Sequence, residues 1–72
     1  MTFSEIKNIV GRTNVKVKSS AFRFSELYAL VDYASSRGEG VLSIVVEDGT
    51  LNSDEIFTLA GIGGSNVSFD FA

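Results

Sequence analysis

The feature that most constrains the fold is a pattern that occurs three times along the chain, each time beginning at a glutamate. Apolar residues stand one, four and five positions after Glu5, Glu26 and Glu55. This spacing places them on one face of an α-helix. They are Ile6, Ile9 and Val10 in the first copy, Leu27, Leu30 and Val31 in the second, and Ile56, Leu59 and Ala60 in the third. The pattern predicts amphipathic helices near residues 3–11, 25–36 and 53–61.

The residues before these helices indicate how each one begins. Thr2 and Asn52 both stand three residues before a glutamate, as in a capping box. In that arrangement the side-chain oxygen of the cap accepts a backbone N–H, and the glutamate accepts the N–H of the cap residue. The second helix lacks this pattern, because Arg23 occupies the cap position. We therefore expect Ser25 to be its cap.

A strand pattern follows each expected helix, after a glycine that favours a helix end at residue 11, 38 or 61–64. Val15 and Val17 alternate with lysines, and the last segment alternates apolar with polar residues. Such alternation is typical of strands with one buried face. The middle segment is apolar on both sides except at Ser43, which favours a central position in the sheet. The expected strands cover residues 15–18, 41–46 and 67–71.

The order of elements predicts one small α/β domain over residues 1–72, built as αβαβαβ. Strands joined through helices are normally parallel, with right-handed crossovers. A spatial order that follows the chain order places all three helices on one face of a three-stranded, mostly parallel sheet. The predicted core consists of Ile6, Ile9, Val10, Val15, Val17, Leu27, Leu30, Val31, Leu42, Ile44, Val46, Ile56, Leu59, Val67, Phe69 and Phe71.

The composition removes several kinds of chemistry. The chain contains no cysteine and no histidine, which excludes Ser–His–Asp and Cys–His catalysis and disfavours a zinc site. A magnesium site from Glu47, Asp48 and Asp54 is conceivable at the carboxyl end of the middle strand, but Asp54 is better explained as a helix-start residue. We expect no enzymatic activity, no metal, no cofactor and no small-molecule substrate.

The charge is distributed unevenly. Residues 1–23 contain five basic residues and one acid, whereas residues 24–72 contain one basic residue and eight acids. Such polarity favours head-to-tail or two-fold pairing. It also leaves open nucleic-acid binding through the basic first third, or an acidic mimic of nucleic acid that acts as an inhibitor. No signal-peptide pattern and no long apolar run is seen, so we expect a cytoplasmic protein without membrane contact.

A partner surface is predicted on the uncovered face of the sheet. Parallel sheets are normally covered on both faces, and three helices can cover only one. An apolar stripe from Val41 and Val45, bordered by opposite charges, is typical of protein-binding surfaces. Our leading prediction is therefore a non-enzymatic interaction module, a small subunit or inhibitor whose partner is another protein or a second copy. The predicted contact residues are Lys16, Lys18, Val41, Ser43, Val45, Ser68 and Asp70.

Two further contact sites are weaker predictions. Asp70 is the only charged residue in segment 67–71 that would discourage edge-to-edge pairing. The edge of this segment is therefore a candidate for pairing with a strand of another chain. Tyr28 and Phe57 occupy equivalent positions in the second and third helices, at the border of the buried stripe. We expect both aromatic rings to lie at the core margin, with an exposed anchor for another protein as the alternative.

Overall fold

The computed structural model describes residues 1–71 and confirms the predicted α/β domain. All three strands are parallel, in the spatial order β1-β2-β3. Two short 3₁₀ turns lead out of β1 and into β3. In chain order the elements are α1 (Phe3–Ile9), β1 (Val15–Lys18), η1 (Ser19–Ala21), α2 (Phe24–Arg37), β2 (Leu42–Val46), α3 (Ser53–Gly63), η2 (Gly64–Asn66) and β3 (Val67–Phe71).

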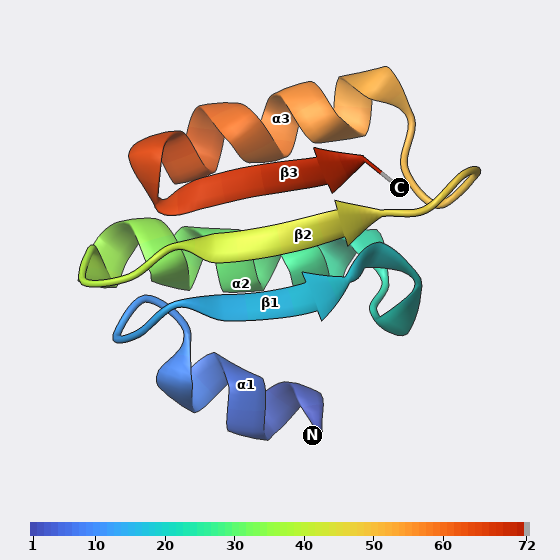
Figure 1. Ribbon diagram of the computed structural model, residues 1–72. Helices are drawn as coiled ribbons and strands as arrows, with labels where there is room; N and C mark the ends of the chain where they lie inside the picture. Colours follow the sequence, from blue (N-terminus) through green and yellow to red (C-terminus); the bar gives the residue numbers. More distant parts are fainter. Residues whose placement is uncertain (72) are drawn as a thin grey trace.

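The helices and the sheet form two layers. Figure 1 looks onto the sheet from its uncovered side, with α2 passing behind the middle of the sheet. In this view α1 lies beyond β1, and α3 lies beyond β3 (Figure 1). Helices pack about 8–10 Å apart, whereas neighbouring strands are about 4.8 Å apart, so a layer of three helices is wider than three strands. The two outer helices therefore overhang the two edges of the sheet.

The helix starts follow the predicted capping chemistry in two cases out of three. Thr2 and Asn52 cap α1 and α3, and each accepts the backbone N–H of its glutamate while that glutamate accepts the N–H of the cap. The prediction of Ser25 as the cap of α2 is wrong, because Arg23 is the N-cap and Ser25 lies inside the helix. The Arg23 amide donates to a Glu26 carboxylate oxygen at 2.9 Å, so the glutamate half of the motif is sufficient here.

Two helix ends differ from the prediction. Helix α1 ends at Ile9 rather than at residue 11, since the backbone is already extended at Val10 and Gly11 adopts a φ of 80°. Helix α3 continues through the glycine run to Gly63 and turns only at Gly64. Gly38 ends α2 in the left-handed conformation, as predicted. The first glycine after a helical pattern is thus not always its end.

The short helix α1 is attached to α2 through one arginine. The Arg37 guanidinium Nη1 donates to the carbonyls of Lys7 and Val10, at 2.5 and 2.9 Å. The same guanidinium lies over the Tyr33 ring, 4.8 Å from its centroid. These contacts satisfy carbonyls at the end of α1 that have no partner within the helix.

The hydrophobic core lies between the sheet and the helices. Most predicted core residues are buried or pack against the buried cluster. Two predictions are wrong: Ile9 is only partly buried and lies outside this cluster, and Phe71 is 65% exposed at the end of β3. Ala34, which the glutamate-based pattern did not include, is fully buried in α2. The fully or nearly fully buried residues are Ile6, Val10, Val17, Leu27, Leu30, Val31, Ala34, Leu42, Ile44, Val46 and Leu59.

Candidate functional site: the open face of the sheet

The residues predicted to form a contact surface lie together on the side of the sheet opposite the helices, which we call the open face. Strand register aligns Lys16 with Ser43 and Ser43 with Ser68 across the three strands. The next row on this face aligns Lys18, Val45 and Asp70. Side chains two residues apart along a strand point to the same face, so the two rows form one surface.

Val41 lies at one end of this surface, immediately before the first residue of β2. Its amide donates to the Asn14 side-chain oxygen at 3.0 Å, and its carbonyl accepts the Val15 amide at 3.0 Å. Its side chain is partly buried, as is that of Val45. The two valines supply the apolar centre of the open face.

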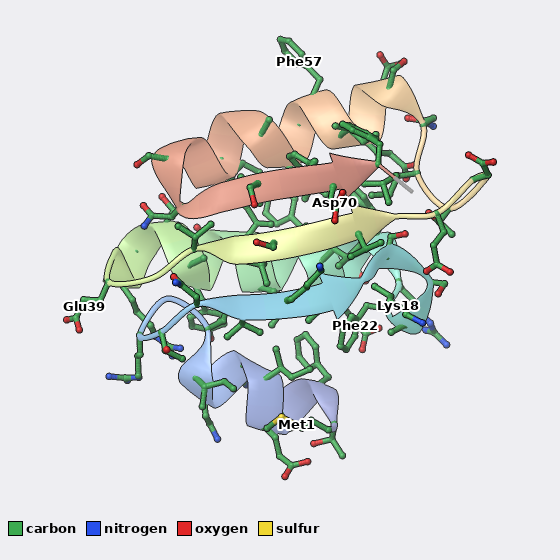
Figure 2. All side chains as sticks on the ribbon, viewed as in Figure 1. Met1, Lys18, Phe22, Glu39, Phe57 and Asp70 are labelled. Atoms are coloured by element: carbon green, nitrogen blue, oxygen red, sulfur yellow. The ribbon has the colours of Figure 1, made fainter. Side chains whose placement is uncertain are left out.

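An ion pair crosses this centre from one edge strand to the other. Lys16 Nζ on β1 lies 3.7 Å from Asp70 Oδ2 on β3, and the two side chains are 67% and 62% exposed. Figure 2 shows Asp70 on the uncovered side of β3 and Lys18 at the far end of β1. An exposed pair of this kind contributes about 0–1 kcal/mol, so it can exchange partners at little cost.

Ser43 and Ser68, which lie between these charges, are hydrogen-bonded to each other within the chain. Ser43 Oγ and Ser68 Oγ are 3.0 Å apart, a hydrogen-bond distance between β2 and β3. The donating hydroxyl keeps two lone pairs, and the accepting hydroxyl keeps one lone pair and its hydrogen, for water or a partner. The open face therefore combines a small apolar centre, a serine pair and two charged borders.

The two aromatic residues proposed as secondary contacts do not belong to this surface. Tyr28 is 44% exposed and stacks edge-on against Phe24, with ring centroids 6.3 Å apart. Phe57 is 80% exposed and points away from the molecule in Figure 2. The expectation that Phe57 lies at the core margin is wrong, because its position on α3 faces solvent.

The basic residues of the first third come from different elements. Lys16 and Lys18 share the open face, while Lys7 lies on α1 and Arg23 caps α2. Arg12 lies in the loop between α1 and β1, where its Nε–H donates to a carbonyl of α1 at 3.1 Å. Only the two sheet lysines therefore belong to the open face.

A polar cluster follows the carboxyl ends of β1 and β2. The buried Ser19 hydroxyl lies 2.6 Å from Thr50 Oγ1 and accepts the Glu47 amide at 3.1 Å. The Ser20 hydroxyl donates to Glu47 Oε1 at 2.5 Å. This bond is the main cause that lowers the pKa of Glu47, followed by the Ser20 amide and the charge of Lys18, against an opposing effect of desolvation. Within residues 1–71, no group of three acidic side chains is arranged to hold a metal ion.

A groove that no sequence pattern indicated lies at the outer edge of β1. Its volume is about 290 Å³. Its walls come from the whole of β1, from α1 and from the turn η1, with Phe22 at one end. A sequence pattern cannot reveal this groove, because it depends on how far α1 lies from the strand edge. The lining residues are Met1, Ile6, Val15, Lys16, Val17, Lys18, Ala21 and Phe22.

Comparisons with known proteins do not identify a family. No protein-family model, curated protein or solved structure matches this chain. Among the described residues, no helix has both the length and the apolar character needed to cross a membrane.

Proposed function

We propose that this protein is a non-enzymatic binding module that acts by contact through the open face, and that a second copy of the chain is the partner. The observation that carries this proposal is the placement of all three helices on one side of a parallel sheet. Parallel sheets normally bury both faces, and Val41 and Val45 are partly buried on the side without a helix. A second layer would complete their burial.

Charge complementarity favours the second copy as that layer. A two-fold axis parallel to the strands, midway between two open faces, places β1 of each copy over β3 of the other. Lys16 and Lys18 then meet Asp70 of the facing chain, and the strands of the two sheets run in the aligned manner common in sheet packing. A two-fold axis across the strands instead places lysine over lysine. The charges therefore select the first arrangement.

The pairing requires little rearrangement of the single chain. The Lys16–Asp70 pair already spans the open face within one chain. In the paired form the same groups exchange their partner for the equivalent group of the other chain. Because the exposed pair is weak, its loss offsets little of the gain from covering Val41 and Val45.

The double variant Val41→Asp/Val45→Asp tests the proposal. Two acids at the centre of each face would be desolvated and would repel their equivalents in the other copy, so we expect association to be lost. Sedimentation velocity at several protein concentrations measures the effect, and circular dichroism verifies that the fold remains. Ser35→Asp/Ser36→Asp is the matched control, since it places the same two charges on exposed positions of α2. A wild-type chain that stays monomeric at every concentration would contradict the second copy as partner.

A further inference from the structure

The groove beside β1 exposes the edge of that strand rather than either of its faces. All four residues of β1 line the groove. Successive side chains of a strand point to opposite faces, with Val15 and Val17 toward the helices and Lys16 and Lys18 toward the open face. A cavity that touches both sets must run along the backbone between them.

The backbone along this edge has unused hydrogen-bonding groups. The Val15 amide donates to the Val41 carbonyl at 3.0 Å, so the polar backbone groups of Val15 face β2. In a parallel pair these groups alternate in direction along the strand, so those of Val17 also face β2. The N–H and C=O groups of Lys16 therefore point into the groove. These are groups that an added strand can pair with.

Most of the residues that line the groove are apolar, and its two charged residues are both lysines. Ile6 and Phe22 belong to the apolar part, and Phe22 makes an edge-on contact with Phe3 at 6.1 Å between centroids. Figure 2 shows Phe22 beside β1 and Met1 at the N-terminal end of α1. Lys16 and Lys18 project from β1 on the open-face side. A strand lying in the groove would thus meet apolar groups on one face and lysines on the other.

The edge strand β3 of a second copy does not fit this groove. Helix α1 overhangs β1, and α3 overhangs β3 (Figure 1). Joining β3 of one chain to β1 of the next requires a strand spacing of about 4.8 Å, at which α3 and α1 would have to approach closer than the 8–10 Å of packed helices. The groove instead suits an isolated extended segment that carries no helix of its own.

We propose that this groove binds an extended peptide segment of another protein, with apolar and acidic residues in alternation, as a fourth strand beside β1. The apolar side chains lie on Ile6 and Phe22, the acidic ones face Lys16 and Lys18, and the peptide backbone pairs with Lys16. Main-chain bonds supply affinity, and the alternating side chains supply specificity, as in other strand-addition complexes. This second site goes beyond the face-to-face pairing proposed above but shares Lys16 and Lys18 with it, so a bound peptide and the Asp70 carboxylates compete for the charges of these two lysines.

The test uses a fluorescein-labelled peptide with the core Val-Glu-Val-Asp-Val, titrated with the full chain and followed by fluorescence anisotropy. We expect saturable binding, weakened at least about tenfold when the two acids of the peptide are replaced by lysines. The chain variant Lys16→Glu/Lys18→Glu should reverse this preference and bind the lysine peptide more tightly. Ser36→Ala is the control that changes an exposed residue of α2 outside the groove and should leave both affinities unchanged.

Hydrogen exchange on the wild-type chain identifies the bound edge without any substitution. The Lys16 amide should exchange more slowly when the acidic peptide is present, whereas amides of β3 should be unaffected. The same titration with the uncharged variant Val41→Asn/Val45→Asn separates this proposal from the pairing of open faces. This variant removes the apolar centre without placing an acid beside Lys18, so peptide binding should survive there. Absence of binding at about 1 mM peptide overturns the proposal, and so does protection of β3 or a charge preference that the lysine variant leaves unchanged.

Discussion

The two sides of β2 differ in how deeply their side chains are buried. Leu42, Ile44 and Val46 point toward the helices and are buried or nearly so. Ser43 and Val45 point to the open face and remain partly exposed. All but one of these residues are apolar, so residue type does not separate the two sides. The difference arises from where the helices lie.

This difference separates the side chains that stabilise the fold from those that we propose to contact a partner. The side chains against the helices lose nearly all their water-accessible surface, which is the largest favourable contribution to folding. The open-face side chains lose less, so they contribute less to the fold of the single chain. A surface that the fold does not depend on can be changed, or covered by a partner, without unfolding the domain. The three predictions below test this division.

The largest expected effect comes from truncating the same strand on its two sides. Ile44→Ala removes a fully buried side chain and should lower the free energy of unfolding by about 2–5 kcal/mol. Val45→Ala, one residue away on the open face, should cost less than about 1 kcal/mol at concentrations where the chain is monomeric. Urea unfolding followed by circular dichroism measures both. Equal losses for the two variants would show that the open face supports the fold as strongly as the core does.

A second comparison concerns two glycines of α3 on opposite sides of the helix. Gly63 is buried, and a Cβ there would come within 2.9 Å of Val31 Cγ1 and closer still to Val67. Gly61 has open space in the same direction. We expect Gly63→Ala to destabilise the domain by about 1–3 kcal/mol through overpacking of the covered side.

Gly61→Ala should act in the opposite direction. Alanine is favoured over glycine in a helix by up to about 1 kcal/mol, and nothing lies in its way at this position. Thermal unfolding of the two variants under identical conditions should therefore shift the melting temperature down for Gly63→Ala and up for Gly61→Ala. A stabilised Gly63→Ala variant would mean that α3 is less tightly packed on β3 than the structure shows.

The fold was predictable because its signals are local and repeat. The apolar spacing after Glu5, Glu26 and Glu55 specifies helices, and the alternation around Val15 and Val17 specifies a strand with two different faces. Short connections and the handedness of crossovers leave few arrangements of such units. Parallel order β1-β2-β3 and the one-sided helix layer follow from these rules, and the structure has both.

The parts that were not predictable depend on distances between elements. Phe71 continues the alternation of β3 but is the last residue of an edge strand and is 65% exposed, so periodicity assigned it to the core wrongly. The predicted cap of α2, Ser25, was wrong because Arg23 needs no capping side chain: its amide donates to the Glu26 carboxylate, and this bond is enough to begin the helix there. The β1 groove arises from the spacing between α1 and a strand edge, which no local pattern encodes. Whether the open face binds a partner remains a prediction.

The smallest expected effect concerns the acid side of the stability profile, at the polar cluster that follows β1 and β2. The Ser20 hydroxyl holds the pKa of Glu47 below its usual value in the folded chain. A carboxyl group with a lowered folded pKa stabilises the fold above its unfolded pKa of about 4.3, and this stabilisation is lost as the pH falls through the folded pKa. Glu47→Gln should therefore flatten the fall in stability below about pH 4.3.

Ser20→Ala provides the matched variant, because it removes the hydrogen bond while keeping the carboxylate. Its acid profile should flatten in the same direction but less than that of Glu47→Gln, because the Ser20 amide and the charge of Lys18 still lower the pKa of Glu47. The double variant should match Glu47→Gln, since without the carboxylate the Ser20 hydroxyl has no charged partner to stabilise. Urea midpoints from about pH 3 to pH 7 measure the three profiles across the range in which this carboxyl titrates. If the profiles run parallel to that of the wild type down to about pH 3, the side-chain contact between Ser20 and Glu47 contributes nothing to stability in solution, as many exposed charged contacts do.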